Sequence, residues 1–382
     1  MRYDVIVIGA GSIGLPASLY LAERKLKVLV IDAEHAPGQG NNKKAIGGVR
    51  ATHSDFGKIS ICQRSIEILR NWESERGEDI GWMSNGYSYP AYREEDAKAL
   101  QELMQVQHGY GLNIRWVSPE EYQNLVPGIA MNGLIGSTYA PEDGSCSPLL
   151  VTNAFYFHAL EAKVDFHFNE RVSSLQLSDG KIQHVITNKG SYAADQVINA
   201  AGNFGRELGL MAGDDLQVYP ENHEAGITEP VARFFGPMVV DMRKAKGSAN
   251  FYFYQNSEGQ VVFCITPDPP ILGIDNRSTS EFLPLCSKRM IEIYPRLHRL
   301  RVRRTWRGQY PMTPDGFPIV GRSTRVKNLI NAVGMCGQGF MLGPGMGELL
   351  SRMCLDELSS DDLLILKSFD PQRDFSVEEA FK

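Results

Sequence analysis

The feature that most constrains the fold is a glycine-rich turn between an apolar strand and a helix at the amino terminus. Residues 3–8 form a nearly continuous apolar run, which suits a strand buried on both faces of a parallel sheet. A helix-like stretch follows the turn to about Arg24, and a second apolar strand over residues 27–31 ends in Asp32. Strand, glycines, helix, strand and acid in this order predict a Rossmann-type α/β unit that binds a dinucleotide.

Each residue type in this unit has a separate physical task. Gly9 permits the tight turn, Gly11 lets the backbone approach a pyrophosphate, and Gly14 lets the helix pack on the strand. Free N–H groups and the positive end of the helix face the phosphates. Asp32 can accept hydrogen bonds from a ribose hydroxyl. The candidate binding residues of the unit are Gly9, Gly11, Ser12, Ile13, Gly14, Asp32 and Ala33.

A second glycine-rich run bears on the choice between NAD and FAD, which the first unit leaves open. Residues 334–347 follow an apolar strand over 329–333, and a helix is expected over 348–356. The free N–H groups at that helix can face a group that gains negative charge, such as the N1–C2=O end of a reduced flavin. The alternative is a second pyrophosphate site for NAD(P)H, but the spacing does not fit G-x-G-x-x-G and no acid-tipped strand follows.

A glycine-containing loop over residues 43–53 lies one short linker past Asp32, and a helix is expected after it over 58–72. One interpretation is a mobile loop with solvated lysines. The other is a loop that crosses the flavin, with Arg50 and His53 near the reacting face. His53 is equally well interpreted as an ordinary surface histidine.

Two further strands are candidates for the nucleotide side of the site. Val172 is expected in a strand that precedes Leu175, and residues 182–187 are the expected hairpin partner of that strand. A buried strand from residue 195 ends at Ala201 and Gly202, which suits a backbone packed against a dinucleotide.

Between residues 219 and 304 the sequence reads as mostly strands. Residues 250–254 and 260–265 predict an antiparallel hairpin, with phenylalanines on one face and Tyr252 and Tyr254 on the other. The tyrosine face is either ordinary amphipathic surface or the wall of a substrate pocket.

Composition sets the remaining limits. The 382 residues carry a net charge of −6, which argues against nucleic-acid binding, and the basic run over 299–307 is interpreted as the solvated face of a strand. The six cysteines form no C-x-x-C pair, so no metal site is expected. Three glycines interrupt the only apolar stretch that resembles a membrane span, and we expect a cytoplasmic protein without one.

Taken together, these motifs resemble the D-amino-acid oxidase family of FAD-dependent oxidoreductases over about residues 3–357. Within that family the pattern is most similar to the β subunits of sarcosine oxidase and of dye-linked L-proline dehydrogenase. The motifs that carry the resemblance are the N-terminal glycines with Asp32, Gly47-Gly48-Val49-Arg50, Asn199-Ala200-Ala201-Gly202, Thr228-Glu229-Pro230, Trp306 and Gly308 with Thr313-Pro314-Asp315, and Gly337-Gln338-Gly339-Phe340.

The resemblance implies a Rossmann-type FAD-binding domain and a second α+β substrate domain built on an antiparallel sheet. The FAD-binding domain would comprise residues 1–80, 147–215 and 320–370, the substrate domain residues 81–146 and 216–319, and residues 371–382 would form a tail. It further implies that a hydride passes to flavin N5 from the carbon next to the nitrogen of a small amino acid or secondary amine. The protein then mainly positions and polarises the substrate.

Departures from the family pattern concern the groups that hold FAD and substrate. Gly308 replaces the cysteine that binds FAD covalently in monomeric sarcosine oxidase, so FAD should be non-covalent. Relatives bind the substrate carboxylate with an arginine or lysine at three positions that are occupied here by Tyr310, Met341 and His53. Close relatives often have a histidine at the position of Gln338. Arg50 remains as the anchor, although it can instead serve the flavin. A desolvated arginine–carboxylate pair is strong and directional.

The expected site has two sets of residues. The candidate catalytic residues are Arg50, His53, Tyr252, Tyr254, Tyr310 and Gln338. Besides those of the first unit, the candidate FAD-binding residues are Lys43, Lys44, Gly48, Val49, Arg50, Val172, Ala201, Gly202, Gly308, Gly337, Gln338, Gly339, Phe340 and Met341.

The electron acceptor would be oxygen, a dye or quinone, or another redox subunit. Two alternative functions stay open. One is an FAD-dependent dehydrogenase of a 2-hydroxy acid or glycerol phosphate, which needs a base such as His53 to remove the hydroxyl proton. The other is a partner-dependent subunit of a hetero-oligomeric dehydrogenase.

Overall fold

The computed structural model describes residues 2–376 and residue 379 of the chain. Its first elements are those the sequence predicts. Strand β1 (Arg2–Ile8) is followed by the glycine turn, helix α1 (Gly14–Glu23) and strand β2 (Val28–Ile31). β2 pairs with β1 in parallel. The predicted strand–turn–helix–strand unit is therefore confirmed.

β1 lies in the interior of a sheet of eight described strands, ordered β17-β18-β11-β1-β2-β8, with the hairpin β9–β10 attached to β11. The pairs from β18 to β8 are parallel, whereas β17 runs antiparallel to β18. All residues of β2 and β18 are buried, as expected for strands covered on both faces. The remaining strands are β8 (Asp165–His167), β9 (Val172–Ser178), β10 (Lys181–Thr187), β11 (Ser191–Asn199), β17 (Ile319–Arg322) and β18 (Leu329–Val333).

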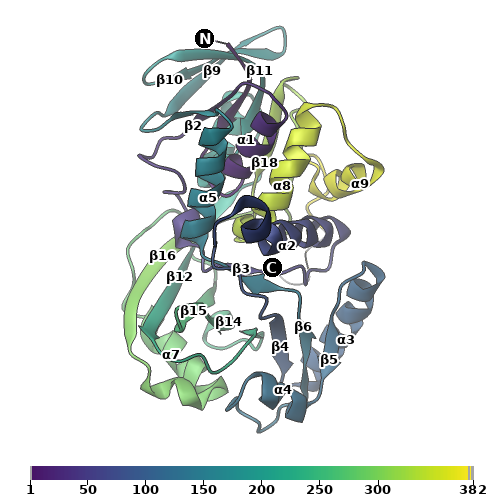
Figure 1. The fold of residues 1–382 in the computed structure, drawn as a ribbon, viewed down its shortest axis with the longest axis vertical. Helices are drawn as coiled ribbons and strands as arrows, with labels where there is room; N and C mark the ends of the chain where they lie inside the picture. The colour runs from purple at the N-terminus through teal and green to yellow at the C-terminus, as the bar shows by residue number, and fades with distance from the viewer. Residues whose placement is uncertain (1, 377–378, 380–382) are drawn as a thin grey trace.

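Helices α1, α2 (Phe56–Arg76), α5 (Pro148–Glu161) and α8 (Gly339–Cys354) share one hydrophobic core with strands of this sheet. α1 packs against α5 and α8, and α2 packs against α8. Figure 1 shows α1, α5 and α8 in the upper half of the molecule, beside the first sheet, and α2 near its middle.

The second sheet occupies the lower half of Figure 1 and also has eight described strands. It is antiparallel except where β13 runs parallel to β4. Its strands, in spatial order, are β16 (Val302–Met312), β12 (Tyr219–Pro230), β15 (Gln260–Asp268), β14 (Gly247–Gln255), β13 (Met238–Asp241), β4 (Tyr87–Ala91), β6 (Gly136–Ala140) and β5 (Arg115–Val117). The two sheets confirm the predicted fold class, while the residue boundaries of the two domains stay a prediction.

Smaller elements join or cover the two sheets. A short ribbon pairs β3 (Gly48–Val49) with β7 (Gly144–Ser145). The other helices and helical turns are α3 (Glu94–Gly109), α4 (Pro119–Leu125), α6 (Gly205–Met211), α7 (Phe282–Ile293), α9 (Ser360–Phe369), η1 (Asn42–Lys44), η2 (Gly202–Phe204) and η3 (Pro295–Arg299). No helix among the described residues is long and apolar enough to cross a membrane.

Helix α8 differs from the prediction because it begins at Gly339, nine residues before the expected start, and ends at Cys354. Glycines usually weaken a helix, but here they permit close packing. A Cβ at Gly343 would lie 2.0 Å from the Ser12 carbonyl oxygen, and one at Gly347 would lie 2.6 Å from Pro16 Cβ. Tertiary contact with α1 therefore outweighs the low helix propensity.

The predicted hairpin is confirmed as β14 and β15. Phe251 and Phe253 are fully buried in the core of the second sheet, and Tyr252 and Tyr254 belong to a different cluster on its other face. One residue of the basic run was wrongly placed at the surface. Arg307 is only 6% exposed, because its guanidinium donates to the Arg277 carbonyl and pairs with an aspartate.

Candidate active site

A cavity of about 790 Å³ lies where the first sheet meets the second. The glycine turn after β1, the end of β2, the end of β11 and the turn before α8 line it from the first sheet. Residues of β13, β14, β15 and β16 line it from the second. Its size suits a cofactor together with a small substrate.

The three glycines of the first turn occupy three different environments. A Cβ at Gly9, whose φ is +112°, would lie 2.4 Å from the Ala200 carbonyl oxygen, and a Cβ at Gly14 would lie 1.9 Å from the Gly9 carbonyl oxygen. These two positions are closed by protein backbone. A Cβ at Gly11 would have no protein atom within 4 Å, and Gly11 lines the cavity. Only there is the backbone open to a ligand, as contact with a pyrophosphate requires.

Asp32 is held at the carboxyl end of β2 beside this turn. Its two carboxylate oxygens accept hydrogen bonds from Ala10 N at 2.6 Å and from Glu34 N at 2.8 Å. Burial raises the pKa of Asp32, and these backbone donors oppose the shift. Ser12, Ile13 and Ala33 also line the cavity.

The N-terminus of α8 meets the N-terminus of α1 at the cavity wall. A Cβ at Gly339 would lie 3.2 Å from Ser12 Oγ, and residues 337–341 all line the cavity. Because α8 begins at Gly339, its free N–H groups lie at the cavity rather than nine residues away. The positive ends of two helices therefore converge on one ligand site.

Arg50 lines the cavity and is 9% exposed. Its Nη1 donates to the Thr52 carbonyl oxygen and lies 3.2 Å from His53 Nδ1, while His53 Nε2 lies 3.5 Å from Cys62 Sγ. Burial, followed by the charges of Arg50 and Lys58, holds the pKa of His53 well below its usual value. A neutral imidazole can accept from Arg50, so His53 orients the guanidinium.

His53 is completely buried, so its interpretation as a surface histidine is wrong. It is not among the cavity-lining residues either, because Arg50 stands between it and the cavity. Four other candidates are also absent from the cavity lining. Gly14 packs on the strand, Val49 pairs with β7 and Tyr254 donates to the Ile46 carbonyl. Lys43 is exposed and donates to Gln39 Oε1 at 2.8 Å.

Two tyrosine hydroxyls form a polar pair where the second sheet lines the cavity. Tyr252 Oη and Tyr310 Oη lie 2.8 Å apart, and both residues line the cavity. The His223 ring stacks on Tyr310 at 3.7 Å between centroids. Tyr310 also packs on Gly337, where a Cβ would lie 2.4 Å from its ring. Burial raises the pKa of both phenols, so both stay neutral and act as hydrogen-bonding groups.

The other predicted residues line the same cavity. Lys44 Nζ donates to Asn276 Oδ1 at 2.6 Å, and burial followed by the charge of Lys43 lowers the pKa of Lys44. The remaining lining residues from the prediction are Gly48, Val172, Ala201, Gly202, Gly308, Gln338, Phe340 and Met341.

Sequence reasoning missed several polar lining residues. The cavity lining also includes Asn42, Asn203, Tyr87, Tyr89 and Gln309. Tyr87 and Tyr89 alternate on β4, a period-two signal like the one that identified Tyr252. The asparagines and Gln309 stand in segments with no such periodicity.

Buried amide oxygens test whether this cavity fits a polar cofactor. Asn42 Oδ1, Asn203 Oδ1 and Gln338 Oε1 have no hydrogen-bond partner among the described residues, and all three residues line the cavity. Buried acceptors are normally satisfied, so their place here indicates a ligand that donates hydrogen bonds. A dinucleotide with hydroxyl and N–H donors fits this requirement.

The fold and cavity define a dinucleotide-binding oxidoreductase with a separate antiparallel sheet facing its cofactor site. The family described as "DAO: FAD dependent oxidoreductase" matches residues 4–353. The chain belongs to this family and is therefore an FAD-dependent oxidoreductase, which confirms the predicted resemblance and cofactor.

Three similar proteins illustrate the relationship. Glycine oxidase of Geobacillus kaustophilus is 26% identical over 370 residues, which cover 95% of each chain. Sarcosine oxidase subunit beta of Rhodobacter capsulatus is 22% identical over 92% of this chain and 84% of its own. The crystal structure of L-proline dehydrogenase from P. horikoshii superposes with a TM-score of 0.91 at 28% identity, covering 97% of both chains. Mammalian dimethylglycine dehydrogenases also match, and the chain spans about 44–45% of their length.

Proposed function

We propose that this enzyme oxidises the C–N bond of a small amino acid or secondary amine of the glycine, sarcosine or proline type. The observation that carries the proposal is a single cavity that joins two helix N-termini to a buried guanidinium and a pair of tyrosine hydroxyls. The relatives named for glycine, sarcosine and L-proline support the same substrate class.

The residues around the cavity divide the work of holding FAD. The turn from Gly9 to Gly14 and the carboxylate of Asp32 would hold the diphosphate and ribose, and the start of α8 would hold the flavin ring. When bound, FAD would supply the acceptor for the hydride, which carries both electrons of the oxidation. We propose that it is held without a covalent bond, since Gly308 offers no thiol at the position where a relative has one.

Arg50 is proposed to bind the substrate carboxylate. It is desolvated and oriented by His53, which makes an ion pair at this position both directional and strong. The Tyr252–Tyr310 pair would accept or donate hydrogen bonds at the amine end of the substrate. An amine that binds in its neutral form needs no protein base, so these residues act by orientation and by exclusion of water.

The position of His53 weakens the alternative of a hydroxy-acid or glycerol-phosphate dehydrogenase. That chemistry needs a base in contact with the substrate hydroxyl. His53 instead contacts Arg50 and Cys62 and does not line the cavity. A His53→Asn variant is therefore expected to raise KM through Arg50 while it keeps turnover. Loss of turnover with an unchanged substrate Kd would favour the alternative.

A substrate screen on the purified yellow protein tests the proposal. Glycine, sarcosine, proline and related amines are added without oxygen, and the flavin absorbance is followed. At least one of them should bleach the flavin, and oxygen or a dye then identifies the acceptor. If none does, while a 2-hydroxy acid or glycerol phosphate does, the proposal is wrong. Bleaching only after addition of a co-purified partner would place the chain in a hetero-oligomer, as the name of the sarcosine oxidase subunit suggests for that relative.

A further inference from the structure

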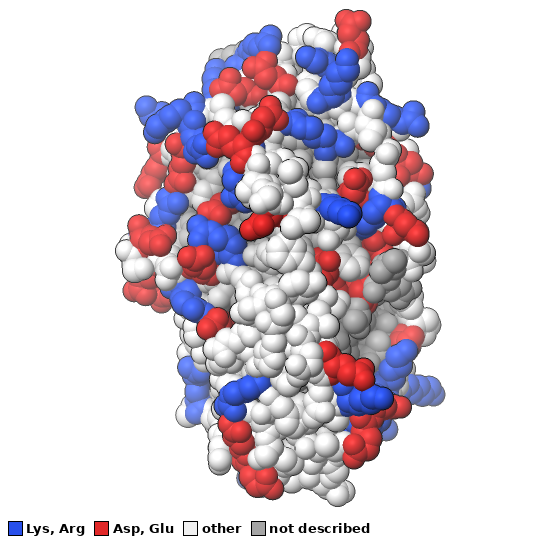
Figure 2. All heavy atoms as spheres, turned by 90° about the vertical axis from the view of Figure 1, so that its right-hand side faces the viewer, with Lys and Arg blue, Asp and Glu red and all other residues white. Residues whose placement is uncertain are grey.

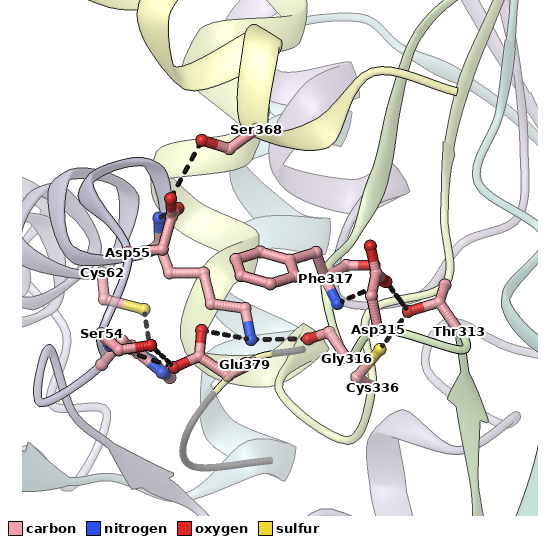
Figure 3. Close-up of polar contacts among 12 residues, drawn as sticks. Ser54, Asp55, Cys62, Thr313, Asp315, Gly316, Phe317, Cys336, Ser368 and Glu379 are labelled. Atoms are coloured by element: carbon pink, nitrogen blue, oxygen red, sulfur yellow. Dashed lines mark hydrogen bonds and ion pairs between the residues drawn. The ribbon is translucent and has the colours of Figure 1, made fainter. Parts of the chain in front are cut away.

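A glutamate close to the C-terminus is buried beside the active site. Glu379 has a fully buried side chain, although it lies three residues from the end of the chain. Its Oε1 accepts from Ser54 N at 3.1 Å and also from Ser54 Oγ. Its Oε2 pairs with Lys58 Nζ at 3.3 Å. Figure 3 shows the Glu379 carboxylate beside Ser54. The carboxylate thus contacts Ser54, which precedes helix α2, and Lys58, which lies in the first turn of that helix.

Lys58 is also completely buried, which is costly for an ammonium group unless it is paired. Besides Glu379, its Nζ donates to the Gly316 carbonyl oxygen at 2.6 Å and lies 4.9 Å from the centre of the Phe317 ring. Lys58 therefore links α2 to the turn that follows β16, and Glu379 supplies the carboxylate that pairs with it.

The same turn holds the C-terminal segment in place. Arg373 donates to both carboxylate oxygens of Asp315, at 2.6 and 3.0 Å, and Glu379 N donates to the Asp315 carbonyl at 2.9 Å. The Arg373–Asp315 pair is itself largely buried. These contacts fix Glu379 against residues 313–317 by bonds that do not involve its own carboxylate.

Both segments that Glu379 joins continue into the cavity wall. Ser54 follows His53, which orients the cavity-lining Arg50. On the other side, Thr313 Oγ1 lies 3.1 Å from Cys336 Sγ, and Cys336 lines the cavity just before α8. Glu379 thus contacts Ser54, the neighbour of His53, which contacts Arg50. On the other side it reaches Cys336 through Asp315 and Thr313.

We propose that Glu379 is a positioning residue for substrate binding. Its carboxylate fixes Ser54, and through the backbone of residues 50–54 it fixes the guanidinium of Arg50. The inference deepens the proposed function, because it assumes that Arg50 binds the substrate carboxylate. No other part of the mechanism uses this ion pair.

The test compares four holoenzyme variants. Glu379→Ala removes the acceptor of Ser54, and KM for the amine substrate should rise about tenfold while kcat changes by less than about threefold. Glu379→Gln keeps an oxygen acceptor for Ser54 and should restore most of KM. The double variant Lys58→Met/Glu379→Ala also removes the buried ammonium that Glu379→Ala leaves unpaired. It does not restore the acceptor of Ser54, so KM should stay raised. Asp374→Asn is the matched control, because Asp374 lies in the same tail, is exposed and, among the described residues, bonds only Ser376 by its side chain.

Amide hydrogen exchange of the peptide covering residues 50–54 gives a second readout that needs no substrate. Exchange should be faster in Glu379→Ala than in Asp374→Asn. If exchange and KM of the two proteins are the same, Glu379 has no positioning role and the inference is wrong. If exchange differs but the wild type oxidises no amine, the proposed function fails and the positioning of residues 50–54 stands.

Discussion

Two glycines of the first turn should respond in opposite ways to the same substitution. Gly11→Ala adds a methyl group where no protein atom lies within 4 Å, and Gly14→Ala adds one 1.9 Å from the Gly9 carbonyl oxygen. The first methyl can meet only a ligand, and the second meets the backbone of its own turn. Gly11→Ala should therefore affect FAD binding, and Gly14→Ala should affect the fold.

The magnitudes follow from the space at each position. Ordinary contact begins near 3.4 Å, so α1 must move by about 1.5 Å to accept Gly14→Ala. Overpacking of this kind costs roughly 1–3 kcal/mol of unfolding free energy. Gly11 has no left-handed φ, so Gly11→Ala should leave the apoprotein unchanged or stabilise it by about 0.4–1 kcal/mol. Gly11→Ala should instead weaken FAD binding about 100-fold, which corresponds to ~2.7 kcal/mol of binding free energy.

Thermal unfolding of the apoproteins and fluorescence titration with FAD separate the two effects. Gly11→Ala should melt at or above the wild-type temperature and bind FAD weakly. Gly14→Ala should melt several degrees lower. Wild-type FAD affinity in Gly11→Ala would refute the assignment of this turn to the diphosphate, and wild-type stability in Gly14→Ala would refute the packing argument.

Three further predictions address the substrate side and the pH dependence of stability. Arg50→Lys loses the planar donor pair and should raise KM about tenfold or more in steady-state kinetics, whereas Lys44→Met should leave KM within about threefold if Arg50 is the anchor. Tyr310→Phe leaves Tyr252 without its hydroxyl partner and should lower kcat/KM by about tenfold, with an unchanged flavin spectrum. Burial raises the pKa of Asp143 to about 7, so the protonated form is favoured in the folded state. The wild type should therefore lose stability relative to Asp143→Asn as the pH rises from about 4 to about 7, as measured by denaturant unfolding, and a constant difference would contradict this.

The elements that sequence predicted well are those specified by local pattern. The first strand, turn and helix follow from apolar runs and glycine spacing within 32 residues. The hairpin β14–β15 follows from alternation, which also placed Tyr252 on the face that reaches the cavity. Helix α8 shows where this approach fails. The glycine-rich sequence of its first half predicts a loop. The residues that stabilise it as a helix lie at and just before α1, more than 300 residues away in the sequence.

The same limit applies to the site. The sequence predicts that Arg50 and His53 lie close together, because they are three residues apart in one motif. Which of them lines the cavity depends on packing, and the structure places Arg50 there. Lys58 and Glu379 carry no motif at all. Their pairing depends on how the tail returns to the turn at Asp315, and no spacing in the sequence encodes that return.

The packing of α1 against α8 makes the cofactor site one unit. Gly343 and Gly347 bring α8 into backbone contact with Ser12 and Pro16, so neither helix can shift without the other. The N-terminus of α1 faces the proposed diphosphate position, and that of α8 faces the proposed flavin ring. A change that loosens this contact must therefore weaken both ends of FAD binding at once, since the distance between the two helix ends sets the length of cofactor that fits.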